Sequence, residues 1–416
     1  MSNTLTVIDM VAADALASLH EKAKFIGTTD KQFDASYNAT TNGSKNGTTL
    51  RVRNDNRFYR RQGSRVMDVQ DQNESTQTIT VATQDGVDIR FNSAELAQSV
   101  AAYKSSDFKE RYITPAMNTL VSGIDADMLV QFTKDVYNQT GTAGTVVGTS
   151  GDTSAIGLAR AKLNQGLAPD DERYLQIDSV TMASIVNGNK ALFAPNNDVS
   201  KAFREGYYGR FGQADWYENE RTWSATYISD VTGTTDAASL VTDGGNSVDM
   251  HTTVVSPNVG QTFTIAGVYA CHPETKQAFA HLQQFVITAT SASGACTVSP
   301  TIYLGLSDTT KAKRNVCKSD GTALALTDFN SQTLTFGGSA SGVYRQNVMY
   351  HKNAFAFVTA ELPLMRGGDC TRMTKDGISI RVWSDSDIRN DEMLMRFDIL
   401  YGGKTLRPEW ACRITN

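Results

Sequence analysis

The segment from Thr78 to Val136 constrains the fold most, because it predicts two strands and then one long helix. Thr78–Ala82 and Val87–Phe91 each alternate polar and apolar residues, as half-buried strands do, and Gln84–Gly86 between them predicts a turn. After these strands, apolar residues recur every three or four positions and form one helical stripe: Ile113, Met117, Leu120, Ile124 and Met128. A helix from Thr114 to Val136 would be about 35 Å long. Such a helix beside a hairpin predicts an extended molecule rather than a concave domain that encloses a pocket.

The length and composition predict a folded protein of several domains. A chain of 416 residues is too long for one ordinary core, so we expect two or three domains. Charged residues make up 20% and apolar residues 40% of the chain, as in folded soluble proteins. The longest obvious apolar run, Ala354–Ala360, falls far short of a membrane helix, so no membrane is expected as a partner. No Lys or Arg precedes Lys22, which argues against a signal peptide and for folding in a cytosol.

The cysteines do not predict disulfides or a metal centre. They are Cys271, Cys296, Cys317, Cys370 and Cys412, an odd number with long gaps and no CxxC pair. Thiols of this kind are typical of a reducing compartment, where they are buried or idle. The pair Cys271–His272 lacks a second Cys or His cluster at ligand spacing, so we expect no metal and no other cofactor.

The net charge of −5 argues against sequence-specific DNA binding, which usually needs a basic face. One short segment is nevertheless strongly basic, with only Asp55 opposing it, and its arginines are Arg51, Arg53, Arg57, Arg60, Arg61 and Arg65. Two interpretations are open for this segment. It contacts an acidic partner surface or phosphate, or it is a solvated basic loop.

The pattern changes several times along the chain. Residues 5–26 predict an amphipathic helix, and from Ser154 helices alternate with buried strands such as Arg173–Asp178. Residues 224–342 are rich in Thr, Ser, Val and Gly, and their short strands between turns predict an inserted antiparallel barrel or sandwich. After His351 the mixed pattern returns, so the domain begun near Ser154 is completed at the end of the chain.

Motifs for catalysis are incomplete throughout. Gly402–Thr405 resembles the end of a phosphate-binding loop, but Asp398 stands where that motif needs its first glycine. No GxSxG turn accompanies the histidines. A solvated loop explains the carboxylates Asp385, Asp387, Asp391 and Glu392 better than acid–base catalysis does, and Asp125 or Asp127 is expected to cap or pair. We therefore expect no catalytic residues and no enzyme.

Several stretches, taken in chain order, resemble the major capsid (coat) proteins of tailed bacteriophages with the Hong Kong 97-type fold. The resemblance is greatest to short-tailed-phage coat proteins that carry an inserted β-barrel domain. The first stretch, residues 47–58 (GTTLRVRNDNRF), is similar to one limb of the family's extended loop, although Asp55 stands where relatives often have proline. The other stretches are residues 80–96, 107–129, 203–219, 261–288 and 377–414, the last containing RFDILYG and Arg407-Pro408-Glu409.

The resemblance implies an α+β fold of the Hong Kong 97 type with an inserted antiparallel β-barrel domain. It divides the chain into an N-terminal arm (1–40), an extended loop hairpin (41–91), a spine helix with the peripheral domain (92–150), the first part of the axial domain (151–223), the inserted barrel (224–346) and an axial and peripheral return (347–416). The implied function is self-assembly into hexamers and pentamers of an icosahedral shell around double-stranded DNA. The implied partners are further copies, a scaffolding protein, a portal protein and packaged DNA held by weak non-specific contact. The implied location is the virion, with the host cytoplasm during assembly.

On this interpretation the six arginines contact neighbouring subunits, and Arg57, Arg60 and Arg61 should face carboxylates of an adjacent copy. An extended hairpin cannot bury its own faces, so it needs a neighbour to cover it. The alternative function is a β-rich virion protein for adhesion or carbohydrate binding, which predicts trimers and exposed aromatic residues near Trp216 and Trp223. A hydrolase has only the scattered carboxylates in its favour.

Overall fold

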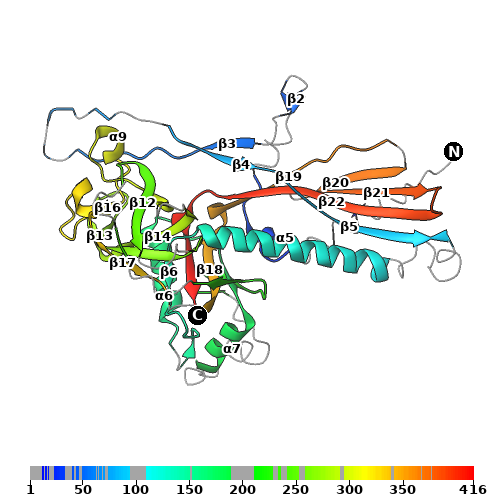
Figure 1. Cartoon of the computed structure of the whole chain (residues 1–416), viewed down its shortest axis with the longest axis horizontal. Coiled ribbons are helices and arrows are strands. Elements are labelled where there is room, and N and C mark those ends of the chain that lie inside the picture. The colour runs from blue at the N-terminus through cyan, green and yellow to red at the C-terminus, as the bar shows by residue number, and fades with distance from the viewer. Residues whose placement is uncertain are drawn as a thin grey trace. The chain divides into compact units, whose positions relative to one another are not determined.

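The computed structural model describes most of the chain (Figure 1). The described residues are 12–13, 15, 17, 23–32, 40–41, 44–45, 49–61, 63, 65–67, 69–70, 74–93, 109–149, 152–188, 210–227, 233–235, 241–252, 258–290, 295–338, 342–366, 368–375 and 377–416. The chain forms two compact units. The first comprises Met1–Val52, Gln77–Met128 and Phe355–Leu406, and the second comprises Arg53–Thr76, Leu129–Ala354 and Arg407–Asn416.

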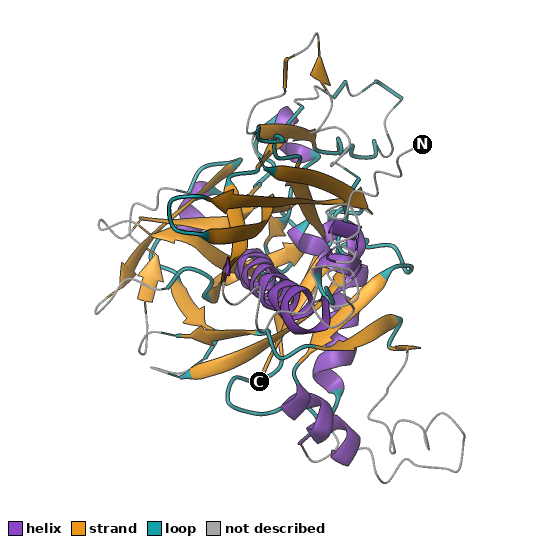
Figure 2. Cartoon of the chain, turned by 90° about the vertical axis from the view of Figure 1, so that its right-hand side faces the viewer, coloured by secondary structure: helices purple, strands orange, loops and turns teal. Residues whose placement is uncertain are grey.

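The first unit is built on a five-stranded antiparallel sheet whose longest strand is β22. Its strands are β5 (Thr83–Asn92), β19 (Phe355–Ala360), β20 (Asp369–Lys375), β21 (Ile378–Asp387) and β22 (Glu392–Thr405). One side of β22 pairs with β21 and then with β19, and the other side pairs with β5 along Glu392–Tyr401. Strands far apart in sequence therefore lie side by side, as β5 (cyan) and β22 (red) do in Figure 1, and Figure 2 shows the strands of the molecule in orange.

The predicted long helix is confirmed as α5 (Thr114–Asp135), preceded by the π-helical turn η2 (Lys109–Ile113). Every residue of the predicted apolar stripe from Ile113 to Met128 is buried, with at most 5% of its surface exposed. The expected capping role falls to Asp125, which is fully buried and accepts hydrogen bonds from the backbone N–H groups of Phe25 and Ile26 at 3.0 Å each. This helix residue therefore holds an N-terminal segment that lies about a hundred residues earlier in the chain.

The turn predicted at Gln84–Gly86 is wrong, because β5 runs unbroken through these residues. Gly86 instead lies opposite Asp398 on β22, and a Cβ there would be 2.8 Å from both the Phe397 carbonyl oxygen and Asp398 Oδ1. The glycine thus allows a close approach of two strands, a role that a single sequence does not distinguish from a turn.

The extended loop begins and ends at a two-stranded sheet of β3 (Thr49–Arg53) and β4 (Thr76–Thr80). Within the first unit, apolar side chains from these strands, among them Val52 and Ile79, pack against Ala356 and Val358 of β19. The base of the loop is thereby fixed to the main sheet of that unit. A second small sheet pairs β1 (Thr40–Thr41) with β2 (Ser44–Lys45).

The second unit contains a mixed sheet in the order β6-β23-β18-β7-β9-β8, with β10 also pairing with β18. These strands are β6 (Gln139–Thr140), β7 (Arg173–Ile177), β8 (Arg210–Phe211), β9 (Ala214–Glu218), β10 (Trp223–Thr226), β18 (Val343–His351) and β23 (Ala411–Thr415). Helices α6 (Ser154–Gln165) and α7 (Ser179–Gly188) pack on it through a buried apolar core that includes Leu163, Leu175 and Ile185. The predicted helix after Ser154 and the buried strand after Arg173 are confirmed.

The second unit also contains a closed β-barrel, which confirms the antiparallel β structure predicted for this part of the chain. Its ring runs β14-β15-β12-β11-β17-β13 and closes through pairing of β13 with β14. The strands are β11 (Gly233–Thr235), β12 (Gly245–Thr252), β13 (Thr262–Cys271), β14 (Ala278–Thr290), β15 (Ala295–Ile302) and β17 (Thr333–Phe336), and β16 (Val316–Cys317) pairs with β13 outside the ring. A buried apolar cluster including Phe263, Phe285 and Phe329 fills the interior.

Parts of three predictions lie outside the described residues. In the predicted helix 5–26, the described residues Ala12 and Ala15 are helical and buried, whereas Ile26–Thr28 form a 3₁₀ turn (η1), so the helix does not extend to Ile26. Residues 94–108, before the long helix, and residues 203–209 of the family-like stretch 203–219 are not described.

Candidate intersubunit contact site

The arginine-rich segment follows β3 into a loop whose two limbs are joined by polar contacts. At its base, the backbone N–H of Asn54 donates to the carbonyl of Ser75 at 2.9 Å, and the Asn54 side chain donates to Ser75 Oγ at 3.0 Å. Farther out, Gln70 both accepts from the Tyr59 N–H (3.0 Å) and donates to the Tyr59 carbonyl (2.7 Å). The amide side chain of Gln70 therefore makes the two hydrogen bonds that the backbone of a paired strand residue would make. It joins the two limbs of the loop beyond the last pair of β3 and β4.

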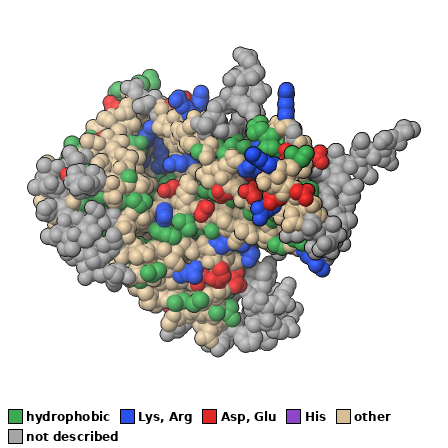
Figure 3. Space-filling view, turned by 45° about the vertical axis from the view of Figure 1, so that its right-hand side comes forward, with side chains coloured by type: hydrophobic (Ala, Val, Ile, Leu, Met, Phe, Trp, Pro, Cys, Tyr) green, Lys and Arg blue, Asp and Glu red, His purple; other side chains and the backbone are tan. Residues whose placement is uncertain are grey.

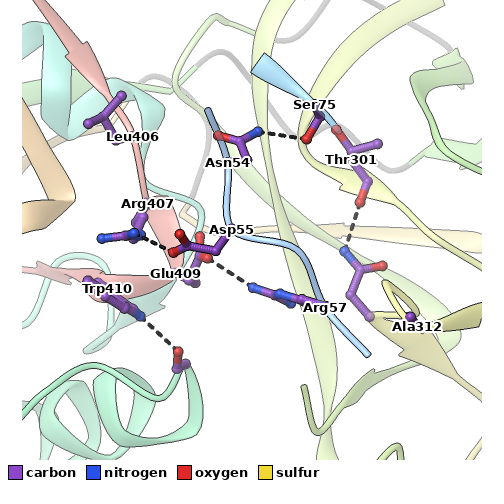
Figure 4. Close-up of polar contacts among 12 residues, drawn as sticks. Asn54, Asp55, Arg57, Ser75, Thr301, Ala312, Leu406, Arg407, Glu409 and Trp410 are labelled. Atoms are coloured by element: carbon purple, nitrogen blue, oxygen red, sulfur yellow. Dashed lines mark hydrogen bonds and ion pairs between the residues drawn. The ribbon is translucent and has the colours of Figure 1, made fainter. Parts of the chain in front are cut away.

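Two ion pairs join the first limb to the segment after β22 (Figure 4). Asp55 pairs with Arg407, and Arg57 Nη2 lies 3.2 Å from Glu409 Oε1. Opposite charges thus alternate along both segments, which fixes their register. Burial raises the pKa of Tyr137, and the nearby Glu409 carboxylate adds to the shift, so this tyrosine stays neutral near the Arg57–Glu409 pair.

The acceptor segment is itself held rigidly in the second unit. The guanidinium of Arg407 lies 4.4 Å from the Trp410 ring centroid, and Trp410 Nε1 donates to the Gly166 carbonyl at 3.0 Å (Figure 4). A Cβ on Gly166 would be 2.4 Å from the Glu409 carbonyl oxygen, so only glycine lets the segment pass this close to the end of α6. The loop is therefore anchored near its base on a preformed surface.

The six predicted arginines differ from one another in burial and in their ion-pair partners along the loop. Arg51 and Arg53 are exposed on β3, where Arg53 lies 3.9 Å from Glu74 across the limbs. Arg57 is half-buried and pairs with Glu409 of its own chain, and the prediction that it faces an adjacent subunit stays a prediction. The side chains of Arg60, Arg61 and Arg65 are exposed in the outer part of the loop. Arg61 also donates to the backbone carbonyls of Arg65 (3.1 Å) and Val66, which curls the loop tip.

Sequence reasoning missed the partner residues Arg407 and Glu409, and only weak signals pointed to them. Asp55 stands out as the one acid among the arginines, and Arg407-Pro408-Glu409 stands out in the last family-like stretch. Nothing in the sequence connects these signals, because the paired residues are 352 positions apart.

The outer part of the loop also exposes large apolar side chains. The exposed fractions are 64% for Phe58, 77% for Val66, 77% for Met67 and 70% for Val69. Exposed apolar residues beside exposed cations are typical of surfaces that another protein covers. On the face shown in Figure 3, by contrast, acidic and basic side chains are interspersed.

The described residues hold no group of three or more His, Cys, Asp or Glu side chains placed to bind a metal ion. His272 Nδ1 accepts hydrogen bonds from the N–H groups of Glu274 and Thr275, so it organises a turn. The Gly402–Thr405 stretch lies within β22, paired with β19, and does not form a phosphate-binding loop. Asp387 caps the turn between β21 and β22 by accepting from the Arg389 N–H. No described helix is long and apolar enough to cross a membrane.

The aromatic residues expected of a carbohydrate-binding surface are not available for that role. Trp216 is 7% exposed and packs in the core beneath the mixed sheet. Trp223 lies between two cations, with Lys134 Nζ 5.6 Å and the Arg413 guanidinium 5.8 Å from its ring centroid. Trp216 and Trp223 themselves therefore do not form an exposed aromatic surface, although Tyr217 beside Trp216 is 36% exposed.

Comparison with known proteins gives one family match. Residues 230–413 match the family model described as "P22 coat protein - gene protein 5". No curated protein sequence matches the chain. Among solved structures, the chain is similar to one titled "Mycobacterium phage Che8", with 12% identity, a TM-score of 0.48 and coverage of 94% of this chain and 90% of that one. It is also similar to "The capsid of Myoviridae Phage XM1", with 9% identity, a TM-score of 0.42 and coverage of 95% and 92%.

The family match concerns a structural coat protein rather than an enzyme. It covers the barrel and the strands that follow it, where the sequence resemblance predicts the inserted domain and the closing segment. The match and the ordered motifs therefore agree, and residues 230–413 of the chain are similar to this coat-protein family.

Proposed function

We propose that this chain is a major capsid (coat) protein of a tailed bacteriophage, that it has the Hong Kong 97-type fold, and that it assembles as hexamers and pentamers into an icosahedral shell around double-stranded DNA. The observation that carries this proposal is the extended loop, which presents apolar and cationic side chains that its own chain leaves exposed. A monomer would gain nothing from exposing Phe58, Val66 and Met67 together, whereas a neighbouring copy could bury them. We also propose the division of the chain into arm, loop, spine helix, axial domain and inserted barrel given above.

The partners follow from the same proposal. A scaffolding protein would assist assembly in the host cytoplasm, and a portal protein would occupy one vertex of the shell. Packaged DNA would be held by weak non-specific contact, since a net charge of −5 disfavours tight binding of phosphate.

Within the loop, Arg60 and Arg61 are proposed to contact carboxylates of an adjacent subunit, while Arg57 fixes the loop through Glu409 of its own chain. Glu74 and Glu409 of the same chain face Arg53 and Arg57, and the 44 acidic residues of each further copy can supply carboxylates for the exposed arginines farther out. Each exposed pair contributes only about 0–1 kcal/mol, but a shell repeats the contact in every subunit.

The test is the double substitution Arg60→Glu with Arg61→Glu. The variant subunit should remain folded and soluble, because both side chains are exposed, yet it should fail to close shells when coexpressed with its scaffolding protein. The matched control, Arg60→Lys with Arg61→Lys, retains the charge and should assemble. Negative-stain electron microscopy and sedimentation velocity measure assembly, and circular dichroism verifies the fold.

Three outcomes would contradict parts of the proposal. Normal shells from the glutamate variant would exclude the intersubunit role of these arginines. Normal empty shells that fail only in DNA packaging would place the arginines in the lumen, against phosphate. Monomers or trimeric spikes from the unaltered protein would contradict shell assembly itself.

A further inference from the structure

Two of the five cysteines lie together on neighbouring strands of the barrel. In the antiparallel pairing of β13 with β16, Tyr269 is opposite Cys317 and Ala270 is opposite Val316. The Cys271 N–H donates to the Asn315 carbonyl at 3.0 Å and extends this pairing by one residue. Cys271 and Cys317 are therefore diagonal neighbours on one face of the strand pair. Val316 points into the barrel core, so the two thiols lie on the opposite face.

Both thiols are shielded from solvent and touch each other. Cys271 is 5% exposed and Cys317 is fully buried, and their sulfur atoms are joined by a hydrogen bond. Each also lies 3.8 Å from a backbone carbonyl oxygen, that of His272 for Cys271 and that of Ala270 for Cys317. Diagonal positions lie about 7–8 Å apart, so closing a disulfide between these thiols requires the short strand β16 to shift toward β13.

Two cations hold the backbone beside this pair. Lys276 Nζ donates to the carbonyls of Ala312 (2.7 Å) and Arg314 (3.1 Å), and Arg314 Nη2 donates to the carbonyls of Lys276 (2.8 Å) and Gly321 (3.2 Å). The hydrogen bond from Cys317, and then the charges of Arg314 and Lys276, lower the pKa of Cys271 against the opposing effect of burial. The pKa of Cys317 is raised, because it donates that bond and is buried. Cys271 is thus the nucleophile of the pair and Cys317 its neutral neighbour.

We propose that Cys271 and Cys317 form an oxidation site, a dithiol that closes to a disulfide between β13 and β16 when the protein meets a small peroxide. In the first step the Cys271 sulfur attacks hydrogen peroxide, the O–O bond breaks, and a sulfenic acid and one water form. In the second step the Cys317 sulfur attacks that sulfenic sulfur, an S–S bond forms and a second water leaves. The two thiols lose two electrons in total, and the peroxide is reduced to two waters.

The other three cysteines do not face a cysteine on a neighbouring strand: Cys296 is opposite Thr290, Cys370 is opposite Trp383 and Cys412 is opposite Met349. Cys296 lies in the barrel core, where burial and the charge of Asp249 raise its pKa to about 11. Cys412 on β23 has its pKa raised to about 12 by burial. Neither thiol is poised to react with peroxide at neutral pH. Cys370 is partly exposed but lies opposite Trp383, so it has no cysteine across the strand pair with which to close a disulfide.

The experiment treats the folded full-length chain with hydrogen peroxide, unfolds it, alkylates the free thiols and measures the intact mass. The unaltered chain should lose two alkylatable thiols and regain them with dithiothreitol, and non-reducing peptide mapping should recover Cys271 linked to Cys317. Cys296→Ser, a barrel control, should behave in the same way. Cys271→Ser should keep all its remaining thiols, whereas Cys317→Ser should stop at a sulfenic acid on Cys271 that dimedone traps.

Several results would overturn the proposal. One is a folded chain that keeps all five thiols at a peroxide concentration that oxidises the urea-unfolded chain. Another is a disulfide that joins a different pair, or a loss of two thiols that persists in Cys271→Ser. None of these readouts depends on shell assembly, so failure here leaves the proposed function untouched.

Discussion

Replacing Asp398 with asparagine should destabilise the first unit by about 3–5 kcal/mol, the usual cost of breaking a buried ion pair from one side. Asp398 on β22 is 1% exposed and pairs with Arg381, which is itself 4% exposed. Its other oxygen accepts from Arg396 Nε at 3.1 Å and Nη2 at 2.8 Å. The asparagine keeps the shape but leaves the Arg381 charge buried without a counterion. The Pro363 carbonyl, at 3.0 Å from Arg381 Nη1, would remain as a neutral acceptor.

The assay is urea denaturation of the unassembled subunit followed by tryptophan fluorescence. Trp383 is the one tryptophan of the first unit, and the Arg381 guanidinium lies 5.9 Å from its ring centroid. Subtracting the signal of Trp383→Phe therefore isolates the unfolding of this unit. The matched control is Asp88→Asn on β5, because Asp88 is exposed and lies 3.9 Å from Arg396. That change should cost less than about 1 kcal/mol.

The pH dependence has a definite sign. Burial alone would raise the pKa of Asp398, but hydrogen bonds from Arg396 and Arg381 outweigh it and lower the pKa below the ordinary value. A carboxyl group whose pKa is lower in the folded than in the unfolded protein stabilises the fold at pH values above its unfolded pKa of about 3.9. That stabilisation is lost as the pH falls through its pKa in the folded protein. The stability gap between the unaltered protein and Asp398→Asn should thus narrow below about pH 4. A cost under about 1 kcal/mol, or a gap that stays constant with pH, would refute the reasoning.

Three further changes test other contacts in the first unit. Gly86→Ala should destabilise it by about 1–3 kcal/mol in urea denaturation, because the new methyl group would overlap the Phe397 carbonyl oxygen; an unchanged midpoint would contradict the close approach. Asp125→Ala should cost about 2–4 kcal/mol and speed hydrogen exchange at the Phe25 and Ile26 amides, which lose their acceptor; unaltered exchange would show that Asp125 does not hold this segment. Gly123→Ala in α5 should raise the free energy of unfolding by up to about 1 kcal/mol, and with it the thermal midpoint, because alanine favours a helix and nothing lies within 4 Å of the added Cβ; a lower midpoint would contradict this.

The elements that the sequence predicts correctly are those with local signals. The stripe from Ile113 to Met128 marks α5, and the alternation around Phe263 and Phe285 marks strands of the barrel. The turn at Gly86 is wrong because the reason for that glycine, the backbone of Phe397, lies in a strand more than three hundred residues away. The ion pairs that anchor the loop could not be predicted from the sequence either. The charges of Arg57 and Glu409 are evident in the sequence, but their pairing depends on how the chain returns after β22.

Closure of the barrel bears on how this protein avoids fibrous growth. Pairing of β13 with β14 leaves none of the six ring strands with a free row of N–H and C=O groups, and β16, outside the ring, is only two residues long. An open edge is a template on which the same strand of another copy can add, and repeated addition gives a filament. A particle built from many copies brings identical domains to high local concentration, where such polymerisation would compete with assembly. Many copies of the closed barrel can therefore lie close together, because the ring has no open edge strand to which a strand of a neighbouring copy could add.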